Sequence, residues 1–227
     1  MYYKSLILLI CIASCKVAKQ SYVQPTSNIN ISAFLTEDEA ISSIMEPYKK
    51  GMSETMNEVI GFCPAFLEKK KPSSILGSFM AEATFQVAKA TGERVDFCLL
   101  NYGGIRSTLD SGDITIEEVF KIMPFENEIT ILTLSKTQMD TLFKLQAQKG
   151  GEPFVNHLWT DQNSYNMMNG TTFRLVTNDY MANGGDNYTV LTEALERIDT
   201  GIKIRDGLIT YITANNPLPL TYKSSTN

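Results

Sequence analysis

Helical and strand patterns are mixed along one uninterrupted stretch of the chain, residues 36–214, and this mixture most limits the folds open to it. Apolar residues recur at helical spacing in some segments and form short apolar runs in others. We predict helices over 74–90, 116–122, 137–148 and 205–214, and strands over 95–100, 129–134 and 171–177. No internal repeat or break divides this stretch, so the pattern indicates one mixed domain of the α/β or α+β class.

A further helix is predicted after Thr36, where Thr36 and Glu39 form a capping-box pattern. Apolar residues follow at helical spacing, and we interpret them as a face packed in the core: Ile41, Ile44, Met45, Tyr48, Met52, Met56, Val59 and Ile60. Pro47 interrupts this face, so we expect a kink or a new helix start there.

The N-terminal segment is typical of an export signal. Lys4 precedes an apolar run over residues 6–12, which is too short to span a bilayer but suits the apolar part of a signal peptide. Residues 12–15 (IASC) resemble a bacterial lipobox, in which the cysteine becomes the lipidated first residue. We therefore expect an exported, membrane-anchored lipoprotein, periplasmic or at the cell surface. A plain signal peptide cut after a small residue is the alternative.

These expectations divide the chain into four parts. They are a signal peptide over 1–14, a lipidated Cys15 with a flexible tether over 15–34, a domain over 35–216 and a polar tail over 217–227. Cys63 and Cys98 remain in the domain, where a disulfide is allowed in an oxidising compartment. Two buried free thiols is the interpretation that we favour.

Charge and histidine content disfavour two classes of function. The formal net charge is −5 and the pI about 5.0, whereas a protein that binds nucleic acid needs a basic face to neutralise the phosphates. His157 is the one histidine, so a metal centre built on several imidazoles cannot be assembled from this chain, and we expect no metal or cofactor in it. No serine or cysteine motif accompanies His157, and we interpret it as a packing or polar loop residue rather than a general base.

Three segments combine glycine with polar or aromatic side chains: residues 101–106 (NYGGIR), 124–127 (PFEN) and 180–188 (YMANGGDNY). Glycine lets a backbone approach a ligand closely, and arginine offers a planar fork for phosphate or carboxylate. Aromatic rings can stack on a flat base, and a carboxylate can hold ribose hydroxyls. Together they suit a nucleoside. Taken singly, each also fits a simpler interpretation: a surface turn, local packing before a strand, or an Asx-type turn.

The same segments carry a resemblance to a known family. Residues 76–83 (LGSFMAEA) are similar to an LGNxxxDA helix, and the three segments resemble motifs NGGGIR, PFGN and FxAxGGDGY in the same order. These motifs mark the C-terminal, substrate-binding domain of the 5'-nucleotidases and UDP-sugar hydrolases. The resemblance extends from about residue 41 to residue 212 and implies a domain of sheets covered by helices.

The resemblance also implies roles for particular residues. Phe125 and Tyr180 match the aromatics that stack on the nucleobase, and Asp186 matches the ribose-binding carboxylate. Asn101 and Arg106 match residues that reach the base and the phosphate side, with Asn127 as another polar contact. The glycines of the two backbone turns are Gly103, Gly104, Gly184 and Gly185. No catalytic residue is implied here, because in the family a metallophosphatase domain carries two metal ions and a catalytic His–Asp pair.

The chain departs from the family pattern at several positions. Tyr102, Glu126 and Asn187 stand where glycine is usual, and Tyr180 stands in place of phenylalanine. The arginine that commonly precedes the LGN motif is missing, and Lys71 is at best a partial substitute. Since Glu126 adds negative charge, the motifs support nucleoside recognition better than phosphate recognition.

The resemblance implies that this chain is the nucleotide- or nucleoside-binding half of a 5'-nucleotidase-type phosphohydrolase that acts in nucleotide breakdown. A separate metallophosphatase chain would bring the divalent metals, and this chain alone would be inactive. The alternative is a non-catalytic lipoprotein that binds nucleosides or keeps the fold only for protein interaction.

Overall fold

The computed structural model describes residues 38–157, 165–166 and 172–222. The expected signal peptide, Cys15 and the tether lie outside these residues, as does Thr36. The helices and strands of the described chain are α2 (Glu39–Met56), β1 (Val59–Cys63), α3 (Ile75–Ala90), β2 (Phe97–Leu99), η1 (Tyr102–Gly104), β3 (Gly112–Thr115), α4 (Ile116–Ile122), β4 (Glu128–Ser135), α5 (Lys136–Gln148), β5 (Phe154–Asn156), β6 (Thr172–Asn178), α7 (Asp179–Ala182), η2 (Gly185–Asn187), η3 (Thr189–Glu193), β7 (Glu196–Lys203) and α8 (Ile204–Ala214). The expected mixture of helices and strands is therefore confirmed.

Helix α2 differs from its prediction. Asp38 caps it, because one carboxylate oxygen accepts the backbone N–H groups of Ala40 and Ile41 at 2.9 and 3.2 Å. The helix continues through Pro47 without a new start and ends at Met56. None of its side chains is buried, so the prediction that its apolar face packs in the core was wrong. Periodicity shows that a helix is amphipathic, but it does not show what covers the apolar face.

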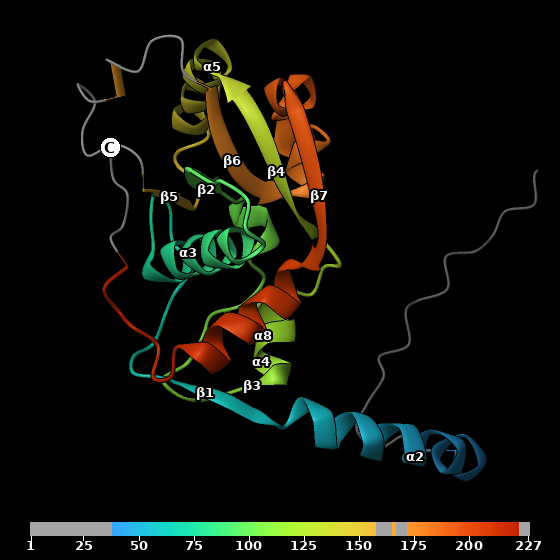
Figure 1. Ribbon diagram of the computed structural model, residues 1–227. Helices are drawn as coiled ribbons and strands as arrows, with labels where there is room; N and C mark the ends of the chain where they lie inside the picture. Colours follow the sequence, from blue (N-terminus) through green and yellow to red (C-terminus); the bar gives the residue numbers. More distant parts are fainter. Residues whose placement is uncertain (1–37, 158–164, 167–171, 223–227) are drawn as a thin grey trace, which may run out of the picture. The chain divides into compact units, whose positions relative to one another are not determined.

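Chain contacts divide the protein into residues 1–45 and 46–227, and both sheets lie in the second part. Its main sheet has five strands in the order β5-β2-β6-β4-β7 (Figure 1). Strands β2 and β6 run parallel, whereas the other neighbours are antiparallel. A second sheet pairs β1 with β3. No helix of the described residues is long and apolar enough to cross a membrane.

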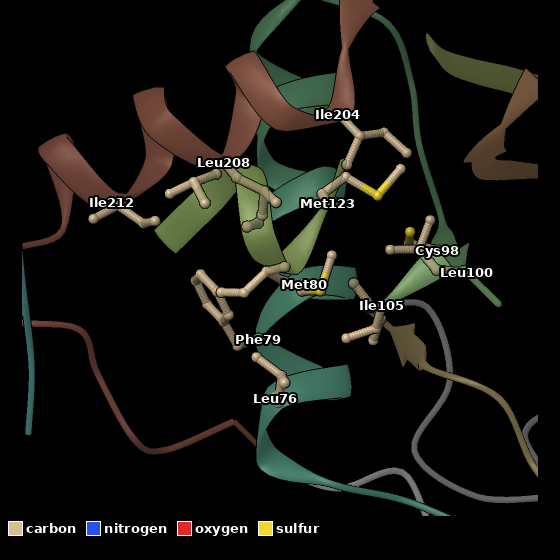
Figure 2. Close-up of a cluster of buried hydrophobic side chains, with 14 of the residues drawn as sticks. Leu76, Phe79, Met80, Cys98, Leu100, Ile105, Met123, Ile204, Leu208 and Ile212 are labelled. Atoms are coloured by element: carbon tan, nitrogen blue, oxygen red, sulfur yellow. The ribbon is translucent and has the colours of Figure 1, made fainter. Parts of the chain in front are cut away.

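One face of the main sheet packs against α3 and α8, and α4 packs against α8. Figure 2 shows Phe79 and Met80 of α3 on the side facing Leu208 of α8, with Cys98 and Leu100 from the β2 segment beside them. Figure 1 shows α8 lying alongside α4. Ser74 caps α3, because its hydroxyl accepts the Gly77 N–H at 3.0 Å. Helix α3, which precedes β2 in the chain, is thus held by its buried face and by the Ser74 cap.

The other face of the sheet packs against α5 and η3. Strand alternation explains the division, since Phe97 and Leu99 belong to this second core while Cys98 belongs to the first. The central strand β4 alternates likewise, with Ile131 on one face and Leu132 on the other. A sheet buried on both faces holds its strand ends in place, and the candidate site lies at one of its edges.

Cys63 and Cys98 are free and buried, as favoured from the sequence. Burial raises the pKa of both thiols. Packed residues continue past Pro217, because Leu218 is buried and donates its backbone N–H to the Phe62 carbonyl at 2.9 Å.

Candidate nucleoside site

One edge of the main sheet gathers the three motif segments. Because β2 and β6 are parallel, their carboxyl ends meet at this edge, and β4 begins there with Ile129 opposite Asn178. Residues 101–106 follow β2, residues 180–188 follow β6, and residues 124–127 precede β4. Segments far apart in the sequence therefore form one pocket of about 400 Å³, lined by Asn101, Gly103, Gly104, Arg106, Phe125, Asn127, Tyr180 and Asp186.

All six side chains that the sequence predicts for substrate binding line this pocket. Phe125 is 41% exposed and Tyr180 is 45% exposed, although both are large aromatic residues. Exposed aromatic rings beside polar groups are typical of ligand sites. The structure thus leaves both rings available for stacking.

Asp186 is held in a conformation that few side chains adopt. Its φ is 52°, in the left-handed region, and Gly184, two residues earlier, has a φ of 85°. Asn101 donates to one carboxylate oxygen at 2.6 Å, and the Tyr180 hydroxyl donates to the other at 3.0 Å. Each carboxylate oxygen can accept a further hydrogen bond, so Asp186 can still bind a diol.

The ring of Tyr180 lies against the backbone of Gly185. A Cβ atom on Gly185 would lie 2.5 Å from the ring, closer than real Cβ contacts allow. The Tyr180 hydroxyl also accepts the backbone N–H of Asp186 at 3.2 Å. The hydroxyl that distinguishes Tyr180 from the family's phenylalanine therefore binds both the backbone and the side chain of Asp186.

Asn101 links two of the motif segments. Besides its bond to Asp186, its carbonyl oxygen accepts from the side-chain amide of Asn178 at 3.1 Å. Added Cβ atoms on Gly103 and Gly104 would lie 3.0 and 3.2 Å from Asn101 side-chain atoms. Glycine at these positions gives the Asn101 side chain room to reach Asp186.

The two remaining polar side chains of the pocket are Arg106, which lies near the Phe125 ring, and Asn127, which contacts Asp179. The Arg106 guanidinium carbon is 5.8 Å from the centroid of the Phe125 ring. Asn127 donates its side-chain amide to Asp179 at 2.8 Å. The same Asp179 oxygen accepts the Tyr180 N–H at 2.9 Å. Sequence reasoning missed Asn178 and Asp179, which immediately precede Tyr180 at the end of the predicted strand.

The three residues that stand in place of glycine, Tyr102, Glu126 and Asn187, are not among the residues that line the pocket, whereas Tyr180 is. Tyr102 is buried, and its backbone N–H donates to Glu152 at 2.6 Å. Lys71 donates to the Lys149 carbonyl at 2.9 Å and lies 3.5 Å from Glu152. Lys71 therefore does not line the pocket in place of the missing arginine. Glu126 pairs with Arg205, so its negative charge faces a cation.

His157 lies outside this pocket. Its Nε2 atom is 2.9 Å from Glu82, and its ring stacks on Phe85 with centroids 4.3 Å apart. It borders a second cavity of about 450 Å³ with Glu82, Asn156 and Tyr211 among the lining residues. These contacts agree with the interpretation of His157 as a packing or polar loop residue.

Metal ligands do not gather in the described chain. Within residues 38–157, 165–166 and 172–222, no group of three or more His, Cys, Asp or Glu side chains could hold a metal ion. The described residues therefore do not fit the two-metal centre that the family resemblance associates with hydrolysis.

One known family matches part of the chain. Residues 55–166 match the 5'-nucleotidase C-terminal domain. Two of the three motif segments fall in this matched region, and the third follows it in the same fold. The resemblance seen in the motifs is therefore supported by a match to the family model.

Curated relatives extend the match along the chain. The chain is 28% identical over 188 residues to the trifunctional nucleotide phosphoesterase protein of Bacillus subtilis, covering 69% of this chain and 13% of the relative. It is 24% identical over 212 residues to the 5'-nucleotidase of Vibrio cholerae, covering 85% and 37%. The chain thus spans well under half the length of these relatives.

Solved structures share the fold. The 5'-nucleotidase precursor of Thermus thermophilus superposes with a TM-score of 0.63 at 20% identity, covering 84% of this chain and 42% of that one. The NAD nucleotidase of Haemophilus influenzae gives a TM-score of 0.60 at 15% identity, covering 83% and 41%. These likenesses establish the 5'-nucleotidase C-terminal fold.

Replacing Gly185 with alanine should strain the site. The new Cβ would overlap the Tyr180 ring, and overpacking of this kind lowers the free energy of unfolding by about 1–3 kcal/mol. Chemical denaturation followed by circular dichroism measures the change. Gly51→Ala is the control, because an added Cβ there meets nothing within 4 Å. Equal stability of Gly185→Ala and the wild type would contradict the close packing of Tyr180 on Gly185.

Proposed function

We propose that this chain is the nucleoside- or nucleotide-binding half of a 5'-nucleotidase-type phosphohydrolase, and that a separate metallophosphatase chain supplies the metals and the hydrolysis. The proposal is carried by one observation. Two exposed aromatic rings, a partly buried carboxylate and an arginine line a single pocket in a 5'-nucleotidase C-terminal fold.

The binding mode follows from the chemistry of these groups. Phe125 and Tyr180 stack on the base, and each base–aromatic stack contributes about 1–3 kcal/mol. Asp186 accepts hydrogen bonds from the ribose hydroxyls, while Asn101 and Tyr180 hold its carboxylate in position. Arg106 is exposed and presents its guanidinium to the 5' side, where a phosphate would be attached.

The division of labour rests on the metal ligands. Hydrolysis of a phosphate ester by this family's chemistry needs two metals, and the described residues offer no group to hold them. The chain therefore contributes binding and orientation, and the partner contributes the attacking group. The names of the relatives, a 5'-nucleotidase and a nucleotide phosphoesterase, agree with a nucleotide substrate.

Calorimetric titration of the full chain tests the binding part of the proposal. We expect adenosine or uridine to bind, and the matching 5'-monophosphate to bind more tightly because of Arg106. In Arg106→Ala, nucleoside and nucleotide should bind equally. If the wild type binds no nucleoside and no nucleotide, the proposed function is wrong.

A phosphate-release assay tests the catalytic part. With AMP and Mg²⁺, Mn²⁺ or Zn²⁺, the pure chain should release no phosphate. Addition of a copurifying metallophosphatase should produce phosphate release from AMP. Robust turnover by the pure chain would contradict a split enzyme. Nucleoside binding without any activating phosphatase would favour the non-catalytic alternative.

A further inference from the structure

Glu126 occupies the centre of the connection between α4 and β4. Its neighbours on both sides, Phe125 and Asn127, line the pocket, but Glu126 does not. Its side chain is 67% exposed and forms an ion pair with Arg205 at the start of α8. The two residues are 79 positions apart in the sequence, so this contact joins the loop to another element.

Arg205 is fixed by the protein core. The residue is only 7% exposed, and its guanidinium carbon lies 3.9 Å from the centroid of the Phe120 ring in α4. Its Nε atom is buried and has no hydrogen-bond partner among the described residues. A buried guanidinium needs a counter-charge, and Glu126 provides it in the described chain. The hydrogen bond and charge of Arg205 lower the pKa of Glu126, so the carboxylate stays ionised.

The same loop is tied to α8 at a second point. The backbone N–H of Ile204 donates to the Asn127 carbonyl at 2.9 Å. Upstream, Met123 donates its N–H to Val119 of α4 at 2.9 Å. Phe125 lies between these two backbone bonds and has no such bond of its own in the described structure. Along the sequence, the ion pair of Glu126 is therefore the tether nearest to Phe125, one residue away.

We propose that Glu126 and Arg205 are positioning residues, which hold the Phe125 ring at the angle that stacking requires. A ring on a loosened loop would lose conformational entropy on binding, and preorganisation removes that loss. This inference rests on the proposed function and deepens it. It also gives the glutamate that replaces the family's glycine a role other than repelling phosphate, since Arg205 balances its charge.

The test measures nucleoside affinity by calorimetry in the full chain. Glu126→Ala should bind about tenfold more weakly, because a loosened Phe125 ring loses part of the affinity that base stacking provides. Glu126→Gln keeps a hydrogen bond to Arg205 and should bind within about threefold of the wild type. Glu128→Ala is the matched control, because it removes a neighbouring ion pair with Lys203, 2.9 Å long, outside the pocket lining, and should leave affinity unchanged.

A double-mutant cycle separates positioning from general destabilisation. If Glu126 acts through Phe125, then Glu126→Ala should have no further effect on affinity in a Phe125→Ala background. Glu126→Ala can also destabilise the fold by leaving Arg205 unpaired. The double variant Glu126→Ala with Arg205→Met removes the buried charge, so it should recover the thermal stability but not the affinity.

The outcomes are distinguishable. Equal affinity of Glu126→Ala and the wild type overturns the positioning role alone. A loss of affinity that persists in the Phe125→Ala background, or that is repaired by Arg205→Met, overturns it as well. A wild type that binds no nucleoside overturns the proposed function, and the positioning role with it.

Discussion

Replacing Asp186 with glycine should weaken nucleoside binding about 100-fold or more. Each hydrogen bond to a charged group contributes about 1.5–3 kcal/mol, and the ribose diol can donate two to this carboxylate. Glycine is the informative replacement, because the backbone at this position has a φ of 52° that alanine adopts poorly. Calorimetry measures the loss directly.

The ribose contact has its own signature. Wild-type protein should discriminate adenosine from 2',3'-dideoxyadenosine, whereas Asp186→Gly should bind both equally. Asn187→Gly is the control, because Asn187 has a φ of 63° in the same turn but does not line the pocket. Retained discrimination in Asp186→Gly would show that another group binds the sugar.

Replacing Phe125 with alanine should weaken nucleoside binding by about 5- to 150-fold. This range corresponds to about 1–3 kcal/mol for one base–aromatic stack. The ring is already exposed, so its removal should change the free energy of unfolding little. Phe125→Tyr keeps a stacking face and should bind within a few fold of the wild type.

The control for Phe125→Ala is Phe66→Ala. Phe66 is also an exposed phenylalanine, but it does not line the pocket. Calorimetric affinities and thermal midpoints of both variants separate stacking from general effects. If Phe125→Ala binds as tightly as Phe66→Ala, then the base does not stack on Phe125.

Helices with clear capping residues could be predicted from the sequence. The helix predicted over 116–122 is α4 (Ile116–Ile122), and the structure shows a capping box of Thr115 and Glu118 at its start. Ser135 caps α5 in the same way. Local hydrogen bonds of this kind are encoded within four residues, so a short stretch of sequence can reveal them. The cap of α2 is an exception, because Asp38 provides it rather than the expected Thr36.

Strands that depend on distant partners were missed. Strand β7 (Glu196–Lys203) alternates exposed with partly buried residues and carries several charges, so it lacks an apolar run. It is a strand because β4 pairs with it. Strands β1 and β3 likewise exist through each other. The prediction that the apolar face of α2 is buried was wrong for a related reason, since a periodic pattern does not specify the surface that covers it.

The candidate site shows the same division. The family motifs named all six pocket side chains, because the resemblance assigns a role to each motif position. The contacts that hold those side chains could not be read from the motifs. Asn178 reaches Asn101 across 77 residues, and Arg205 reaches Glu126 across 79. Only the sheet and the packing of α8 bring these partners together.

A crystal structure of the full chain grown with adenosine would test the central claim most directly. We expect the base to lie between the rings of Phe125 and Tyr180, with the ribose hydroxyls within hydrogen-bond distance of Asp186. Adenosine in the cavity beside His157, or a ribose turned away from Asp186, would contradict it.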